Sequence, residues 1–479
     1  MTMNSRTRWL ALYVLCLGDL MIVLDGTIVN VALPTIRDDL GFSQTSLAWI
    51  VNAYLLTFGG FLLLGGRLGD LFGQRRMFLV GIGLFTAASL ACGLSTTQGQ
   101  LVTARAVQGL GGALVAAVAL SLVMTLFTEP ADRAKAMGIF GFVLSGGGVA
   151  GVLLGGVLTD ILSWHWIFFI NIPVGALVFV LSLRLLPEAP GLAGGTRLDI
   201  GGAFTITGAL MLAVYAIVNG NETGWLTAQT LGLLAGALVL LAAFLVLETR
   251  VKAPLVPLAL FRNRDVSSAN AVGILMAAGM FAYFFFSALY LQQVLGYTPL
   301  EVGLAYVPGM VIWGACSLYS DRLVMRFGIK PPLLAGLSLM ALSLLLFARA
   351  PVDGSFATDV LPATVAVGIG AGIAFNPILL AAMSGVAPQE AGLASGVVNT
   401  SFMMGGALGL AVLASLAALR TDRLETAGEA TVVATNAGYH LAFLVGALFL
   451  AGATALAALL IRATVPSPDR EAEPATEAA

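Results

Sequence analysis

Charged residues are scarce in this sequence. Asp, Glu, Lys and Arg make up 10% of its 479 residues, whereas soluble domains carry about 25%. Hydrophobic residues make up 59%, which leaves too little polar surface to cover a soluble fold. We therefore predict a membrane protein with the lipid bilayer as its surroundings. The net charge of −2 and the lack of a basic patch make a nucleic-acid partner unexpected.

Cysteine and histidine are scarce too, with three and two copies. Cys16, Cys92 and Cys316 lie inside apolar runs, so we interpret them as small buried residues. The sequence has no spacing typical of metal ligands and no GxxxxGKS/T loop for a nucleotide. We therefore expect no metal and no bound cofactor. A membrane-embedded enzyme or receptor is disfavoured, because neither a catalytic constellation nor a sizeable soluble domain is evident.

Apolar runs of about 20 residues fill most of the chain, and this length predicts membrane-spanning helices rather than barrel strands. The first run is too long for the apolar part of a signal peptide, and no cleavage site follows it. We predict fourteen spans at residues 9–33, 47–66, 77–95, 101–127, 136–159, 165–186, 200–218, 228–248, 267–292, 301–320, 332–348, 359–384, 393–418 and 440–461.

Lys and Arg are distributed unevenly between the predicted loops. With the N-terminus in the cytoplasm, 18 of the 23 lie in cytoplasmic loops and tails and 4 lie on the opposite side. We therefore predict that both termini are cytoplasmic. Arg far outnumbers Lys, and Ala, Gly and Leu are abundant, which is typical of GC-rich bacterial genomes. The predicted location is a bacterial cytoplasmic membrane, which the chain crosses many times.

A short charged loop occurs twice. Residues 66–76, between spans 2 and 3, have a degenerate copy at 321–330, and residues 130–138 have one at 388–396. Spans 2–5 thus correspond to spans 10–13, which predicts two related six-helix halves with two inserted helices between them. Such parallel repeats are typical of secondary transporters, whose site lies at the midplane. The predicted units are 1–186 (first half), 187–266 (inserted helices), 267–462 (second half) and 463–479 (disordered cytoplasmic tail).

The first copy of the loop combines glycines and charges at fixed spacing. It resembles the signature loop between the second and third helices of the major facilitator superfamily. The resemblance implies the all-α fold of that superfamily and a conformational latch, in which Asp70 would pair with Arg75 and Arg76. An ordinary positive loop around a turn is the alternative. Met325 occupies the place of Asp70 in the second copy, so the predicted latch is asymmetric. The latch residues are Gly66, Gly69, Asp70, Gly73, Arg75 and Arg76.

An acidic residue, Asp25, lies inside the first span. Residues 24–34, LDGTIVNVALP, resemble the first-helix signature of the fourteen-span drug:proton antiporters of the same superfamily. An ionised carboxylate is costly in hydrocarbon, and a buried carboxyl readily takes up a proton. We interpret Asp25 as a proton-coupling residue, with a structural hydrogen bond to another helix as the alternative. Asp19 lies about 120° around the helix from Asp25 and is a second candidate for proton or substrate binding.

Arg105 is the one Lys or Arg that lies well inside a predicted span, since Arg184 is at the cytoplasmic end of the sixth span and is counted with the cytoplasmic residues. Residues 105–112 resemble the fourth-helix signature of the superfamily. Arginine stays charged in proteins, so it needs a carboxylate, carbonyls or water as partners. The resemblance implies that Arg105 influences proton transfer at an acid of the first span. The alternative is that Arg105 extends to the membrane surface.

Closely spaced glycines mark the fifth span. They resemble the antiporter signature of this helix, although Val152 stands where the family pattern usually carries proline. Glycines four residues apart share one helix face, and we expect close packing against another helix. These residues are Gly147, Gly151, Gly155 and Gly156.

Several polar and aromatic residues are candidates for substrate contact. Residues 163–175 also resemble the fourteen-span group, with His165 at a position where arginine is more usual. His165 is interpreted as an interfacial residue, with pH sensing as the alternative. Aromatic residues with a few polar groups suit large amphiphilic or cationic compounds, although core packing is the alternative for an aromatic run. The substrate candidates are Asn30, Asn52, Tyr54, Tyr283, Tyr290 and Asn376.

These features predict a monomeric efflux antiporter driven by the proton motive force. It would export drugs, antibiotics or other amphiphilic small molecules by alternating access, in exchange for protons. One alternative is a dedicated exporter of a single endogenous metabolite, such as a self-made antibiotic or siderophore. A proton-coupled importer shares the same fold, and only the first- and fifth-helix signatures argue against it.

Overall fold

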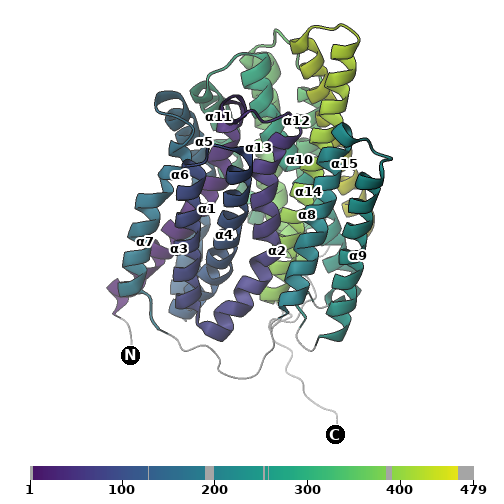
Figure 1. Cartoon of the computed structure of the whole chain (residues 1–479). Helices are drawn as coiled ribbons and strands as arrows, with labels where there is room; N and C mark the ends of the chain where they lie inside the picture. The colour runs from purple at the N-terminus through teal and green to yellow at the C-terminus, as the bar shows by residue number, and fades with distance from the viewer. Residues whose placement is uncertain are drawn as a thin grey trace.

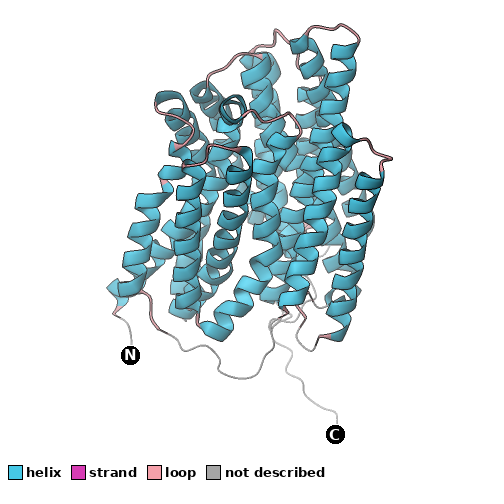
Figure 2. Cartoon of the chain, in the orientation of Figure 1, coloured by secondary structure: helices cyan, strands magenta, loops and turns pink. Residues whose placement is uncertain are grey.

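The computed structural model describes residues 4–127, 129–188, 199–251, 254–256, 258–383 and 391–461. Every regular element in these residues is a helix (Figure 2). Thirteen of the helical stretches found there are long and apolar enough to cross a membrane. The predicted all-α, multi-pass fold is therefore confirmed. The predicted tail, residues 463–479, lies outside the described residues.

The first half of the bundle contains unusually long helices, of which the first carries Pro34 in its interior. The side chains of the fifth helix are described only in part, and the apolar stretch found in it is Ala150–Ile161. The elements of this half are α1 (Ser5–Leu40), η1 (Ser46–Ala48), α2 (Trp49–Phe72), α3 (Gln74–Gly93), α4 (Gln98–Leu126), α5 (Pro130–Ile161), α6 (Trp166–Phe169) and α7 (Asn171–Leu185).

Two further helices, α8 (Ile200–Thr223) and α9 (Ala228–Arg250), separate the first half from the second. The second half then follows with its own set of long helices. Its elements are η2 (Leu258–Arg262), α10 (Arg264–Leu289), η3 (Tyr290–Val294), α11 (Pro299–Phe327), α12 (Lys330–Phe347), η4 (Phe356–Val360), α13 (Leu361–Met383), α14 (Ala391–Thr426) and α15 (Thr431–Leu460).

The two halves repeat one packing pattern. In the first half α1 packs on α5, α2 and α3 pack on α4, and α3 packs on α7. In the second half α10 packs on α14, α11 and α12 pack on α13, and α12 packs on α15. The halves meet along two seams, where α5 packs on α11 and α2 packs on α14. The inserted helix α8 packs on both α2 and α14 (Figure 1), so it covers the second of these seams.

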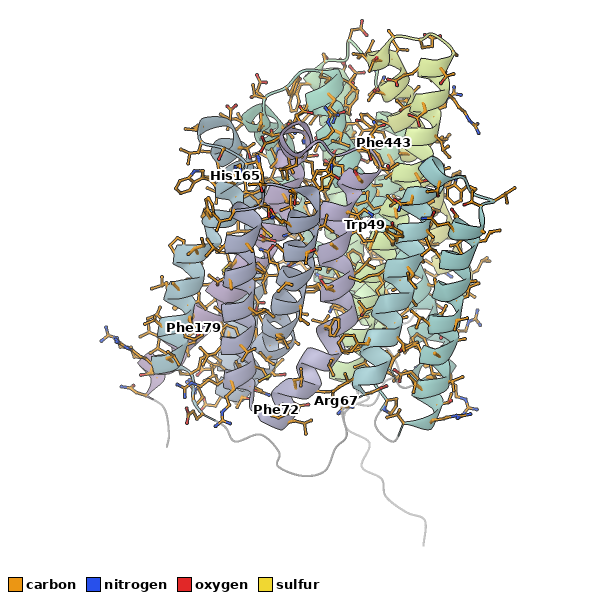
Figure 3. All side chains as sticks on the ribbon, in the orientation of Figure 1. Trp49, Arg67, Phe72, His165, Phe179 and Phe443 are labelled. Carbon is orange, nitrogen blue, oxygen red and sulfur yellow. The ribbon has the colours of Figure 1, made fainter. Side chains whose placement is uncertain are left out.

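Helix α1 begins and α15 ends at the same end of the bundle (Figure 1), which we call the termini face. The opposite end is the far face. Figure 3 places Arg67 and Phe72 at the termini face and His165 toward the far face. The charged loop between α2 and α3 therefore lies on the same side as the start of α1 and the end of α15.

The turns after α2 and α11 each contain a glycine with a positive φ angle. Gly73 ends α2 with a φ of 96°, and Gly328 ends α11 with a φ of 80°. Residues with a side chain rarely adopt such positive φ values, so both turns require glycine. The two copies of the charged loop thus fold into similar turns, whereas their side chains differ.

Candidate functional site

The carboxyl group of Asp25 lies in the centre of the first half and is 1% exposed. Arg105 of α4 donates to Asp25 Oδ2, and the two side chains form a buried ion pair. Asp25 Oδ1 accepts from Gln108 Nε2 of α4 at 2.7 Å and from Asn171 Nδ2 of α7 at 3.0 Å. Two helices, α4 and α7, therefore supply partners to the single acid, and each carboxylate oxygen is hydrogen-bonded.

The hydroxyl group of Ser89 completes this network from α3. It accepts from Gln108 at 3.2 Å and from Asn171 at 3.0 Å, and it donates to the Phe168 carbonyl at 2.9 Å. Ser89 is fully buried. A buried polar network is stable only if its members are satisfied, and these contacts meet that condition around Asp25.

The guanidinium group of Arg105 is also enclosed by protein, with 1% of the residue exposed. Its Nε donates to the Ile50 carbonyl at 3.0 Å, and its Nη1 donates to Gln108 Oε1 at 2.8 Å. The guanidinium carbon lies 4.4 Å from the centre of the Tyr54 ring, a cation–π contact. Arg105 thus does not extend to the membrane surface in this conformation, and it is the direct partner of Asp25.

Gln108, Asn171 and Ser89 were not among the site residues predicted from the sequence. Each is a polar residue in an apolar span, and the first two fall inside motifs that resemble family signatures. Their polarity within apolar spans was the sequence signal that could have identified them as site residues. Which helix faces meet around Asp25 depends on the packing of α3, α4 and α7 on α1, and a single sequence does not specify this packing.

Asp19 lies outside this network. It is 5% exposed, and its Oδ2 has no hydrogen-bond partner among the described residues. Among the described residues, no hydrogen-bond partner joins Asp19 to Asp25. Its role in proton or substrate binding stays a prediction.

The glycines of α5 divide between two neighbouring helices. A methyl group at Gly155 would lie 2.8 Å from the Ile28 carbonyl oxygen, and Gly147 and Gly151 also face α1. Gly156 faces α11 instead, where a methyl group would lie 2.7 Å from the Pro299 carbonyl oxygen. The glycine run therefore places α5 tightly against α1, which carries Asp25, and also against the other half.

The predicted latch residues lie at the termini face. Asp70 and Arg76 are exposed, and Gly69 packs closely on Val118 of α4. Arg75 does not pair with Asp70 in this conformation, because it forms an ion pair with Glu188 at 2.6 Å and donates to the Leu183 carbonyl. The latch itself stays a prediction, but the structure assigns Arg75 a partner that the sequence analysis did not expect.

The substrate candidates of the second half lie in its core. Tyr283 is 3% exposed and packs on the rings of Phe284, Tyr306 and Phe347. Tyr290 is fully buried, and its hydroxyl donates to the Pro351 carbonyl at 2.8 Å. In this conformation both tyrosines act as packing residues, which was the alternative interpretation.

The remaining substrate candidates differ in their surroundings. Asn30 is 7% exposed and donates to the Gly26 carbonyl at 3.1 Å. Asn52 is fully buried, and neither of its amide atoms has a hydrogen-bond partner among the described residues. Tyr54 contacts Arg105, and Asn376 is partly exposed on α13. Asn52 and Asn376 thus keep free hydrogen-bonding capacity, and their role in substrate contact stays a prediction.

A polar cavity of about 460 Å³ opens at the far face between the two halves. Arg37 and Asp38 of α1 line one side, and Gln292, Gln293 and Tyr297 of the second half line another. Nearby, Gln292 Nε2 donates to the Val31 carbonyl at 2.8 Å, so the halves touch at this end.

In the described residues, no group of three or more His, Cys, Asp or Glu side chains is placed to hold a metal ion.

Comparison with known families identifies the class of protein. Residues 15–410 match the family model of the Major Facilitator Superfamily. The chain therefore belongs to this superfamily and is a multi-pass membrane transporter. A solved structure of a bacterial homologue of the human lysosomal transporter Spinster, in an inward-facing and unoccupied conformation, superposes with a TM-score of 0.69. That match covers 96% of this chain and 98% of the other, at 17% sequence identity, and it supports the fold alone.

Curated relatives are more similar in sequence. The puromycin resistance protein of Streptomyces alboniger is 41% identical over 92% of this chain and 90% of its own length. The cephamycin export protein of Amycolatopsis lactamdurans is 39% identical over 86% of this chain and 85% of its own. A multidrug resistance protein of Mycobacterium tuberculosis is 37% identical over 88% and 78%. The relatives therefore include proteins named for resistance to, or export of, antibiotics.

Proposed function

We propose that this protein exports drugs, antibiotics or other amphiphilic small molecules in exchange for protons, as a fourteen-span drug:proton antiporter. The single observation that carries this proposal is the buried Asp25–Arg105 pair with its amide and hydroxyl partners. The names of the relatives support export as the direction of transport. In this proposal α5 spans the membrane in addition to the thirteen long apolar helices, which gives fourteen spans. The helices α8 and α9 are the two spans inserted between two halves of six spans each.

The chemistry of the pair explains how proton binding would act on the fold. Protonation of Asp25 removes the negative charge that compensates Arg105, and an uncompensated buried charge costs several kcal/mol. The network then rearranges, and α1 shifts relative to α4. Because α5 packs on α1 through Gly151 and Gly155 and on α11 through Gly156, movement of α1 reaches the seam between the halves.

In this proposal the termini face is cytoplasmic and the far face is external. A proton from outside reaches Asp25 and favours release of the exported compound, and loss of that proton to the cytoplasm resets the carrier. Asp19 is a second site for the proton or the compound. The proton motive force supplies the energy, and the transporter acts as a monomer.

Export of one self-made antibiotic is the second candidate for the substrate class. Relatives named for cephamycin export and for tetracenomycin C resistance and export favour it, because each is named for a single compound. A susceptibility panel in a host without its own pumps separates the two: protection against one compound class indicates a dedicated exporter, and protection against unrelated classes indicates a multidrug exporter.

Proton coupling is tested in everted membrane vesicles that carry a proton gradient. We expect an exported compound to accumulate in wild-type vesicles, and a protonophore to abolish the accumulation. Asp25→Asn should lose proton-driven accumulation, whereas the control Asp132→Asn, which removes an acid paired with Arg8 at the termini face, should retain it. If Asp25→Asn accumulates the compound as wild type does, the coupling role is refuted, and accumulation in right-side-out vesicles instead would indicate import.

A further inference from the structure

The inserted helices are attached to both halves of the transporter. Phe204 of α8 packs edge-on against Phe61 of α2, with ring centres 5.3 Å apart. Asn221 of α8 donates to the Ser415 carbonyl of α14 at 2.7 Å, and the Ser415 hydroxyl lies 3.0 Å from Asn221 Oδ1. The hairpin of α8 and α9 therefore bridges α2 and α14, the two helices of one seam between the halves.

The segment between α9 and α10 crosses the same seam at the termini face. We call this segment, residues 254–262, the strap; residues 254–256 and 258–262 are described. Leu255 and Val256 pack with Leu63 and Leu64 of α2. Leu260 of the strap packs with Val397 of α14 and Val266 of α10. The strap thus joins the first half to the second.

Two carboxyl groups hold the strap and the start of α8. Asp199 caps α8, with its Oδ1 accepting from the Gly202 backbone N–H at 2.7 Å. Glu248, in the last turn of α9, accepts from the Val256 backbone N–H of the strap through its Oε2 at 3.1 Å. Asp199 is 6% exposed and Glu248 is 4% exposed. Each acid therefore accepts a backbone hydrogen bond with one of its two oxygens, and both side chains are buried away from water.

The second oxygens of these two acids converge. The position of a methyl group at Gly202 lies 2.5 Å from Asp199 Oδ2 and 2.9 Å from Glu248 Oε1, so both oxygens face one point. Both are buried without a hydrogen-bond partner in the described part of the chain. Glycine at 202 leaves the space that the two oxygens share.

In the part of the chain that the structure describes, no nearby charge neutralises the pair, because neither acid takes part in an ion pair there. Two close carboxylates in a buried site cannot both stay ionised, and such pairs retain one proton between them. The charged groups on the adjoining elements are Arg67 and Asp70 of α2, Arg250 of α9, Arg262 of the strap, and Arg264 and Asp265 of α10, of which all but Asp265 are exposed.

We propose that Asp199 and Glu248 form a proton-binding site, in which one carboxyl O–H donates to the other carboxylate, and that this proton holds the strap on the α2–α14 seam. The proton comes from water and returns to water. When it leaves, the two carboxylates repel each other, Glu248 moves away from Asp199, and its hydrogen bond to Val256 is lost. The site is separate from Asp25 and gives the inserted helices a role in pH response.

Infrared spectroscopy of the purified protein tests the shared proton without substrate or membrane potential. The spectrum of wild type minus that of Glu248→Gln, and minus that of Asp199→Asn, should show the carbonyl band of a protonated carboxylic acid, and this difference band should disappear at alkaline pH. Each variant lacks the shared proton, because the amide N–H takes its place, whereas protonated Asp19 or Asp25 contributes equally to all three spectra and cancels. The matched control is Asp265→Asn, which removes a carboxyl beside the strap but outside the pair and should keep the band.

Deuterium exchange at the Val256 amide tests the effect on the strap. After correction for the intrinsic rate, exchange in wild type should become about tenfold faster at alkaline pH, because a hydrogen bond to a charged group is lost. Glu248→Gln should exchange slowly at every pH, since its amide keeps both contacts. Asp199→Asn, which also preserves the cap of α8, provides the same test if Glu248→Gln does not fold.

The proposal fails if wild type and both amide variants give equal infrared spectra, or if Val256 exchange in wild type does not respond to pH. Neither result bears on export, because no compound is transported in these measurements. Conversely, loss of proton coupling at Asp25 would leave this site untouched. The two proposals can therefore fail separately.

Discussion

The two halves share one helix arrangement, but the side chains at their centres differ: the first half has a buried ion pair and the second half has an aromatic cluster. In the first half α1, α3, α4 and α7 enclose Asp25 and Arg105 with Gln108 and Asn171. In the second half α10, α11 and α12 bring together Tyr283, Tyr306 and Phe347, and the Ser287 and Tyr306 hydroxyls lie 2.6 Å apart. The packing was repeated between the halves while the charge was not.

This difference indicates a division of labour. A buried ion pair changes its free energy by several kcal/mol when a proton binds, whereas an aromatic core does not respond to a proton. Under the proposed function, the first half would sense the proton and the second half would move against it as a rigid body. Substitutions at equivalent positions of the two halves should therefore separate the two roles.

The largest effect is expected at Arg105. Arg105→Leu leaves Asp25, Gln108 and the Ile50 carbonyl without their partner, and breaking a buried ion pair costs about 3–5 kcal/mol. Thermal unfolding of the purified protein in detergent should show this loss, and transport should be abolished. The double variant Asp25→Asn with Arg105→Leu should regain most of the stability without regaining transport. A double variant as unstable as Arg105→Leu would show that the pair is not the source of the loss.

Equal effects in both halves are expected at the helix-packing glycines. Gly151 of α5 faces Thr27 and Leu24 of α1, and Gly409 of α14 faces Ala278 of α10, where a methyl group would lie 2.8 Å from Cα. Alanine at either glycine overpacks the contact, at a cost of about 1–3 kcal/mol. Thermal unfolding measures both.

A second substitution checks that overpacking is the cause. Thr27→Ala removes the hydroxyl that the new methyl group at position 151 would meet. It should therefore restore part of the stability of Gly151→Ala and none of that of Gly409→Ala. If Gly151→Ala is destabilising and Gly409→Ala is not, the close packing at the two glycines does not contribute equally to the stability of the two halves.

The sequence predicted the helices and the superfamily well, because long apolar runs and glycine-rich loops are local signals. It also placed Asp25 and Arg105 in spans, although their pairing came from a resemblance rather than from spacing. Asn171 and Ser89 were missed because they join the network around Asp25 only through the packing of α3 and α7. The role of Tyr283 in substrate contact stays a prediction, because an aromatic residue in a helix that is apolar all round gives no indication of which face is core.

The smallest effect on stability is expected at the loop that occurs in both halves. Gly73 and Gly328 make similar turns, but Asp70 is exposed at the first turn and Met325 at the second. Substituting either exposed side chain should change the free energy of unfolding by less than about 0.5 kcal/mol. Asp70→Asn should nevertheless slow transport several-fold if the acid latches one conformation, and Met325→Leu should leave transport unchanged.

Transport rates in vesicles, normalised to the amount of protein inserted, distinguish these outcomes. Met325→Leu serves as the matched control, since it occupies the equivalent turn and keeps an apolar side chain. Equal slowing by both variants would mean that the turn itself, and not the acid, sets the rate. If Asp70→Asn slows transport and Met325→Leu does not, the turn follows the same pattern as the two centres. Both halves then share the helix packing and the turns, whereas the charged side chains that affect transport, Asp25, Arg105 and Asp70, belong to the first half.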